Sequence, residues 1–192
     1  MKVAQFEACI AAGECSSANY NTFETNALCN EGRGAVWADH PMNCVNWHGA
    51  NEYCAWIGGR LPTDEEWEYA STHNGTEHLN IKYAFGDTLQ HCVNVNYYDS
   101  TTSMYCDGHE KSETKIGTSP VGAYSPEGDS PLGLVDMSGN VWEWTDSLYL
   151  SDVGGARVFK GGSWELDEYH LAVTYRYAVA ATDRMSSAAQ NK

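Results

Sequence analysis

Apolar residues recur at helical spacing near the start of the chain. Cys9 and Ile10 follow Phe6 by three and four positions, which places all of them on one face of a predicted helix over residues 3–12. Gly13 marks the end of this helix, because glycine readily adopts the backbone conformation that terminates helices.

Two further helices are predicted by their capping residues. Asn46 is a preferred N-cap, and a pair of glycines at 58–59 ends the segment that it opens. Thr63 and Glu66 form a capping box, in which each side chain can accept a hydrogen bond from the other residue's backbone amide. The apolar positions that these two helices would bury are Ala50, Tyr53, Cys54, Ile57, Trp67 and Ala70.

Strand patterns are short and confined to the second half of the chain. Residues 158–164 predict a strand that leads into a double-glycine turn. A loose alternation of apolar residues predicts one or two more short strands up to Val179. The polar ranges 14–40 and 71–117 predict surface loops.

The densest chemistry lies in residues 133–145, which hold two tryptophans and two carboxylates. Asp136 and Glu143 stand on either side of a predicted turn at Ser138 and Gly139. Such a turn can bring both carboxylates and several backbone carbonyls into one oxygen-lined pocket, which is the coordination that calcium requires. The same pattern fits a strand entered through a glycine turn with both tryptophans in the core, and the spacing alone favours this simpler interpretation.

Composition and charge narrow the class of protein. A length of 192 residues is typical of one domain. A formal net charge of -15 argues against nucleic acid and against anionic membrane surfaces as partners, because both attract basic proteins. No apolar run approaches the roughly 18 residues of a membrane span, so no membrane insertion is expected. The chain opens on Met1-Lys2 without the pattern of a signal peptide.

Seven cysteines predict disulfides and therefore an oxidising compartment, extracytoplasmic or at the cell surface. None belongs to a Cys-x-x-Cys pair, which argues against a zinc ribbon or a thioredoxin-like site. Cys15 and Cys29 enclose one polar loop, and Cys92 and Cys106 enclose another, so these are the first two predicted bridges. Seven reduced, buried thiols are the alternative.

The stretch GLVDMSGNVWEWT at residues 133–145 resembles the central signature of the formylglycine-generating enzymes, also called sulfatase-modifying factors. Further blocks resemble the family in the same order, at residues 40–70, 83–87, 118–124 and 157–164. This resemblance implies an α+β fold of the formylglycine-generating-enzyme type. That fold is C-type lectin-like and rich in loops, with two or three helices and short antiparallel strands.

The resemblance runs from about residue 3 to residue 184 and implies one sulfatase-modifying-factor-like domain over residues 1–192. A strand-rich segment before the first helix and a closing Gly-Phe-Arg strand are missing, so we expect a fragment of a longer protein. In the family the cysteine that matches Cys54 can pair beyond that closing strand. Cys54 is therefore expected to be unpaired and buried, with Cys9–Cys44 as a third disulfide.

The resemblance also implies two structural calcium sites. At the first site Asn94 would contribute a side-chain oxygen and Val95 a backbone oxygen. The spacing of its acidic partner has shifted, and Glu113 matches that place better than Asp107. The second site would use the side chains of Asp136 and Glu143 and the carbonyls of Gly139 and Val141.

The oxidation chemistry of the family does not carry over to this chain. Its active members hold copper on two cysteines shortly after the segment that corresponds to residues 161–164, and soft thiolates are what Cu(I) requires. Residues 165–174 contain no cysteine here, and none occurs after Cys106. We therefore expect no catalytic residues and no copper.

A second branch of this fold also lacks the cysteine pair. These are the variable proteins of diversity-generating retroelements, which display a hypervariable ligand-binding surface near the C-terminus. Trp164, Arg176 and Arg184 fit scaffold positions, and the residues between them fit displayed ones, although an ordinary surface fits them equally well. The resemblance implies a non-catalytic module that binds a protein or small-molecule ligand. The predicted ligand-binding positions are Glu165, Asp167, Tyr169, His170, Tyr177, Val179, Ala181 and Thr182.

The alternative is an enzyme of the wider family. It would be a formylglycine-generating cysteine oxidase that activates sulfatases, or a relative of the iron-dependent sulfoxide synthases. The second kind needs a histidine-rich iron site on an additional helical domain, and the seven histidines of this chain are scattered.

Overall fold

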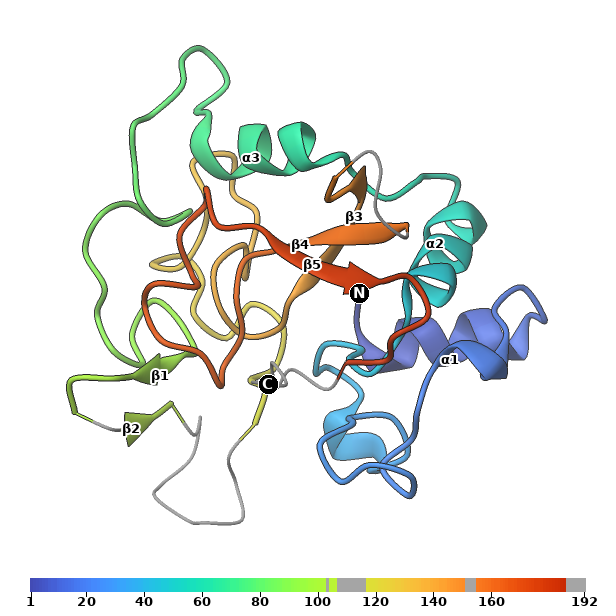
Figure 1. Cartoon of the computed structure of the whole chain (residues 1–192). Helices are drawn as coiled ribbons and strands as arrows, with labels where there is room; N and C mark the ends of the chain where they lie inside the picture. The colour runs from blue at the N-terminus through green and yellow to red at the C-terminus, as the bar shows by residue number, and fades with distance from the viewer. Residues whose placement is uncertain (103, 107–116, 151–154, 186–192) are drawn as a thin grey trace.

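The computed structural model describes residues 1–102, 104–106, 117–150 and 155–185. Three helices surround one side of a small central sheet (Figure 1). They are α1 (Val3–Ala11), α2 (Trp47–Trp56) and α3 (Asp64–Thr72). All three predicted helices are confirmed.

Local sequence determines how these helices begin. The Asn46 side chain accepts a hydrogen bond from the Gly49 amide at 2.9 Å. At the start of α3 the Thr63 hydroxyl accepts from the Glu66 amide at 3.2 Å, and the Glu66 carboxylate accepts from the Thr63 amide at 2.9 Å. One apolar position was predicted wrongly. Ile57 is 59% exposed, because α2 ends one residue before it.

Three antiparallel strands form the central sheet in the order β3–β4–β5. Their bounds are Glu143–Leu148, Ala156–Lys160 and Tyr177–Ala180. The strand predicted over residues 158–164 is present, but it begins two residues earlier and ends where the double-glycine turn starts. Each of the two glycines in that turn has a positive φ, which other residues adopt only with strain.

Smaller elements lie in the ranges predicted as loops. Two 3₁₀ helices, η1 (Ser17–Asn19) and η2 (Ala35–Trp37), interrupt the first loop. A short hairpin of β1 (Tyr98–Asp99) and β2 (Met104–Tyr105) lies in the second. Apart from the last two residues of α3, the rest of both ranges is irregular in the part that the structure describes, as the polar sequence predicts.

Aromatic side chains fill the core between the sheet and α2. The ring centroids of Trp144 and Phe159 lie 4.0 Å apart. The indole N–H of Trp144 donates to the Val45 carbonyl at 3.0 Å, and that of Trp47 donates to the Thr145 carbonyl at 3.0 Å. These anchors bury large apolar area while their polar ends remain hydrogen-bonded, which suits a loop-rich domain.

Three disulfides close the loops, and two of them differ from the prediction. Cys92–Cys106 is confirmed. Cys15–Cys29 and Cys9–Cys44 are wrong, because the chain turns back after α1 and brings Cys15 to Cys9, with their Cα atoms 5.3 Å apart. Cys29 instead pairs with Cys44.

Cys54 is unpaired, as predicted. It is half-buried rather than buried, because it lies in the wall of a cavity.

Candidate functional site

A cavity of about 410 Å³ lies between α2, the turn before β3 and the sheet. Its walls are mostly apolar and include the rings of Trp142, Trp144 and Phe159. Two carboxylates, those of Asp136 and Glu143, also line it. The structure therefore brings together the two acids that the sequence singled out.

A left-handed backbone turn positions Asp136. Asp136, Gly139 and Asn140 have φ values of 57°, 81° and 62°. Left-handed residues other than glycine are uncommon, and Asp and Asn tolerate this conformation best. The Asp136 Oδ2 atom accepts a hydrogen bond from the Gly122 amide at 2.8 Å, which fixes the direction of the carboxylate.

Glu143 is the first residue of β3. Its Oε2 atom accepts a hydrogen bond from the indole N–H of Trp67 on α3 at 2.5 Å. Among the described residues, neither Glu143 nor Asp136 forms an ion pair. Two acids thus share a largely apolar cavity, and no described side chain neutralises them.

Burial raises the pKa of both acids. For Glu143 desolvation is the main cause, and the charge of Asp136 raises the pKa further. For Asp136 desolvation again dominates, against the opposing effect of the Gly122 amide. A bound cation would relieve this cost, because it would favour the charged form of both carboxylates.

The two predicted carbonyl ligands differ in position. Val141 lines the cavity, whereas Gly139 does not and is packed against other backbone. A Cβ atom at Gly139 would lie 2.4 Å from Val95 Cγ2 and 2.5 Å from the Asn96 carbonyl oxygen. Three of the four predicted ligands therefore face one space, and the fourth lies in the turn behind it.

The first predicted calcium site lies only partly within the described residues and stays a prediction. Asn94 and Val95 are both buried, but the Asn94 Oδ1 atom already accepts a hydrogen bond from the Gln90 amide at 3.1 Å. Glu113 and the alternative Asp107 lie outside the described residues.

An ion cluster around the buried Lys160 connects α3 to the sheet, and the sequence analysis did not predict it. Lys160 is fully buried at the end of β4, with its Nζ atom 2.6 Å from Glu68 Oε1 and 3.2 Å from Asp64 Oδ1. Arg176 binds the second Asp64 oxygen at 2.5 Å. The Lys160 ammonium also lies 5.3 Å from the centroid of the Trp67 ring. Trp67 therefore connects this cluster to Glu143. The lysine at the end of the otherwise apolar run 158–160 was the one feature of the sequence that could have indicated a buried ion pair.

One group of three possible metal ligands occurs elsewhere in the described part of the chain. Atoms of His91, Cys92 and Cys106 lie within 4.8 Å of one another. The two cysteines form a disulfide, so their sulfur atoms are oxidised and are not thiolate ligands.

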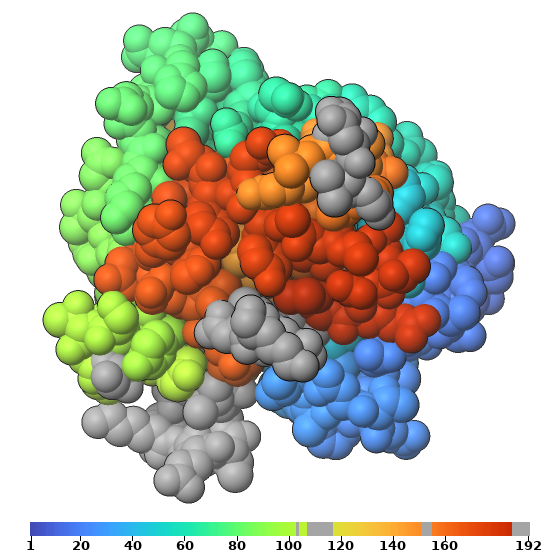
Figure 2. Space-filling model, viewed as in Figure 1, coloured from blue at the N-terminus to red at the C-terminus, as the bar shows by residue number. Residues whose placement is uncertain are grey.

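The predicted ligand-binding residues lie on the loop between β4 and β5, along β5 and just after it, in a region that forms much of the face shown in Figure 2. Tyr169 is 66% exposed, and Asp167 binds His170 at 2.6 Å. The prediction that Val179 belongs to the ligand surface is wrong. Its side chain is only 3% exposed and packs in the core, because it points to the inner face of the sheet. Ala181 and Thr182 follow the end of β5 rather than joining the loop residues. The remaining positions, at least partly exposed, are Glu165, Asp167, Tyr169, His170, Tyr177, Ala181 and Thr182.

The scaffold positions are mixed in character. Trp164 is buried, whereas Arg176 and Arg184 are exposed. Arg176 is held by Asp64, and Arg184 donates to the Ala18 carbonyl. Among the described helices, none is both long and apolar enough to cross a membrane.

Solved structures show the same fold. Treponema denticola variable protein 1 superposes with a TM-score of 0.60 at 20% identity, covering 97% of this chain and 79% of that one. CarF superposes with a TM-score of 0.61 at 21% identity, covering 96% and 78%. At these identities the likeness concerns the fold alone.

Curated relatives are closer in sequence. The inactive C-alpha-formylglycine-generating enzyme 2 of Bos taurus is 37% identical over 126 residues, which are 66% of this chain and 39% of that protein. The formylglycine-generating enzyme of Mus musculus is 35% identical over 164 residues, covering 75% of this chain and 40% of the enzyme. The chain thus spans about two fifths of the length of these relatives.

Residues 2–191 match the family model described as the sulfatase-modifying factor enzyme 1-like domain. That match covers nearly the whole chain, and it agrees with the fold and with the curated relatives. The chain therefore belongs to the sulfatase-modifying factor enzyme 1-like family, the family of the formylglycine-generating enzymes.

Proposed function

We propose that this chain is a non-catalytic ligand-binding module on the formylglycine-generating-enzyme fold. One observation supports this most strongly: the chain offers no pair of cysteines for copper. Six of its seven cysteines form disulfides, Cys54 is isolated, and none lies beyond Cys106. One relative, from Bos taurus, is itself named inactive, which is consistent with a protein that has kept the fold of the family but not its oxidation chemistry.

The proposed ligand surface consists of the seven remaining predicted positions, which lie on the loop between β4 and β5, at Tyr177 on β5, and at Ala181 and Thr182 just after β5. Tyr169 contacts Tyr175, with ring centroids 5.3 Å apart, and Tyr175 contacts Trp142 at 5.9 Å. Tyrosines on a rigid base supply broad contact area at low entropic cost, as they do in antibody loops. Retroelement-driven diversification would act on these positions, and the ligand would be a protein or a small molecule in an extracytoplasmic setting.

Structural calcium is part of the proposal. Asp136, Glu143 and Val141 would hold the ion, with Gly139 shaping the turn. One oxygen of each carboxylate accepts a hydrogen bond from an N–H donor, which would orient the carboxylate as a ligand, and the Asn140 side chain also hydrogen-bonds to Asp136. Calcium would supply the positive charge that this part of the cavity lacks. The site at Asn94, Val95 and Glu113 stays a prediction.

A peptide selection tests the ligand surface. Random peptides displayed on phage are selected against the intact protein and then measured against a variant in which the seven positions, all at least partly exposed, are replaced together. We expect the selected peptides to bind that variant at least about tenfold more weakly, because binding energy concentrates on exposed aromatic anchors. A control variant carries substitutions at Glu7, Glu14 and Glu24, three exposed acids in the N-terminal part of the chain.

The variants must first show cooperative thermal unfolding like that of the wild type. Peptides that bind the seven-position variant and the wild type equally would contradict the proposed surface. The alternative function is that of a cysteine oxidase, and a measured cysteine-oxidising activity of the protein would support that alternative instead.

A further inference from the structure

We propose that the ligand surface extends onto the β1–β2 hairpin, where Tyr98, Tyr105 and Glu165 form a subsite for an organic cation. The cation would be an ammonium or guanidinium group, such as that of a lysine or arginine side chain. This inference rests on the proposed binding function and adds residues that the sequence did not point to.

The two tyrosines form an aromatic pair on neighbouring strands. Tyr98 and Tyr105 are direct cross-strand partners, with ring centroids 4.8 Å apart and planes inclined at 42°. The Tyr105 ring also lies 5.9 Å from the ring of Trp164, which precedes Glu165 in the chain. Both tyrosines are half-buried, so part of each ring remains accessible. Aromatic faces attract cations through their quadrupole.

The Glu165 carboxylate supplies the complementary charge. Its Oε2 atom is buried and has no hydrogen-bond partner among the described residues. In the same part of the chain Glu165 forms no ion pair. Burial raises the pKa of Glu165, and the Glu165 charge in turn raises the pKa of Tyr105, after the larger effect of burial. A desolvated carboxylate beside a tyrosine pair thus has no cationic partner in the part of the chain that the structure describes.

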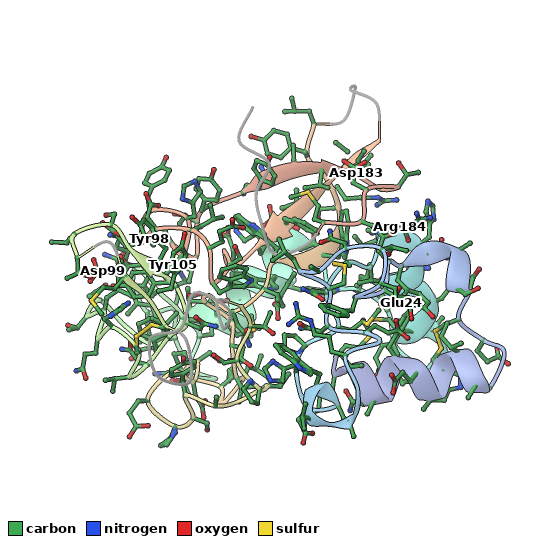
Figure 3. The ribbon with its side chains drawn as sticks, turned by 90° about the horizontal axis from the view of Figure 1, so that it is seen from below. Glu24, Tyr98, Asp99, Tyr105, Asp183 and Arg184 are labelled. Atoms are coloured by element: carbon green, nitrogen blue, oxygen red, sulfur yellow. A yellow bond between two sulfur atoms is a disulfide. The ribbon has the colours of Figure 1, made fainter. Side chains whose placement is uncertain are left out.

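The hairpin is attached to the proposed ligand surface. The Tyr98 amide donates to the Leu166 carbonyl at 3.0 Å. The Ser100 hydroxyl lies 3.0 Å from Glu168 Oε1. In Figure 2 the surface of the hairpin adjoins that of the residues after β4, and in Figure 3 Tyr98, Asp99 and Tyr105 lie together at one side of the molecule.

The surrounding charges favour the same class of ligand. Asp99 and Glu168 both raise the pKa of Tyr97, which reaches about 12 mainly because this tyrosine is buried. Lys82 lies near Glu168, but its ammonium stacks over Tyr83, 4.9 Å from the ring centroid. Within the described residues, the negative charges around the tyrosine pair are therefore not fully neutralised, and a cationic group would gain from them.

Tetramethylammonium is a suitable probe, with tert-butyl alcohol as its neutral counterpart of similar shape. The intact protein, labelled with ¹³C in its tyrosine rings, is titrated with each compound, and the ring signals are followed by NMR. We expect saturable shifts of the Tyr98 and Tyr105 signals with tetramethylammonium and none with the alcohol. Glu165→Gln and Tyr105→Leu should each weaken binding about fivefold or more, whereas Tyr105→Phe should keep it.

The matched control is Glu127→Gln, which removes an exposed carboxylate elsewhere and should leave the titration unchanged. Unsaturable shifts, equal binding of the alcohol, or an unaltered titration of folded Glu165→Gln would overturn the inference. If tetramethylammonium fails in one of these ways but the selected peptides still require the seven positions, only the cation subsite is wrong. If tetramethylammonium binds but the peptides ignore those positions, the proposed ligand surface fails and the subsite stands.

Discussion

At the scale of single residues, the turn between Asp136 and Asn140 restricts most strongly which residues the sequence can carry. It combines several left-handed residues with close backbone packing at Gly139. This geometry sets the direction of one carboxylate and the entry into β3, which carries the other. The candidate metal site therefore depends on a short local sequence.

Substitution of Gly139 by alanine should destabilise the fold by at least about 2 kcal/mol, because strain at positive φ adds to a clash with the Val95 side chain and the Asn96 carbonyl. Gly133→Ala is the matched control, since its φ is +77° but nothing lies within 4 Å of the added Cβ. It should cost only about 1 kcal/mol. Chemical denaturation measures both, and equal losses would show that packing at Gly139 is unimportant.

Removal of calcium should lower the melting temperature if Asp136 and Glu143 hold the ion. A ligand that binds only the folded state stabilises it by about 2.7 kcal/mol at a hundredfold excess over its dissociation constant. Asp136→Asn should abolish most of the response to calcium, and Asp183→Asn, at an exposed carboxylate after β5, should not. A melting curve that is the same with calcium and with chelator would contradict the site.

At the scale of elements, the helices were predictable and the sheet was only partly so. Asn46 and the pair Thr63–Glu66 act within their own segments, so their effect can be read locally. Strand β5 pairs with β4 across a long loop, and its start at Tyr177 depends on that non-local pairing. The burial of Lys160 likewise depends on where α3 places its acids.

The cap of α3 gives an acid-stability prediction. The Arg60 guanidinium and the Thr63 amide hold the pKa of Glu66 at about 2. A lowered folded-state pKa contributes stability that is present above the ordinary value near 4.5 and is lost as the pH falls toward 2. Glu66→Gln should therefore lose less stability than the wild type between these pH values.

Thermal unfolding as a function of pH measures this difference. Glu77→Gln, at an exposed glutamate that follows α3, should keep the slope of the wild type. Parallel curves for Glu66→Gln and the wild type would show that the capping box does not contribute to acid stability.

At the scale of the whole molecule, disulfides and aromatic anchors hold a loop-rich domain together. The sequence allowed several cysteine pairings, and the correct one depended on how the chain returns after α1. The cavity could not be predicted from the sequence either, because its walls come from three separate parts of the chain: α2, the turn before β3 and the sheet. The sequence indicated only that Asp136 and Glu143 could lie close together, because a turn at residues 138 and 139 separates them.

The disulfides should contribute according to the loops that they close. Cys29–Cys44 spans 15 residues and Cys9–Cys15 spans 6. Replacing both cysteines by serine should cost about 3 kcal/mol for the longer loop and about 2 kcal/mol for the shorter, because a longer loop has more entropy to lose. Denaturant titrations of the two double variants measure this, and the reverse order would contradict the loop-entropy explanation.

The central claim is that this chain keeps the fold of the family without its cysteine oxidation. The most direct measurement is mass spectrometry of a sulfatase-type cysteine peptide after incubation with the protein, copper, oxygen and a reductant. An active formylglycine-generating enzyme assayed in parallel confirms that the conditions are competent. We predict that the peptide remains a thiol, because no thiolate pair follows Trp164. Conversion of the peptide cysteine to formylglycine at a rate comparable to that of the active enzyme would contradict the account.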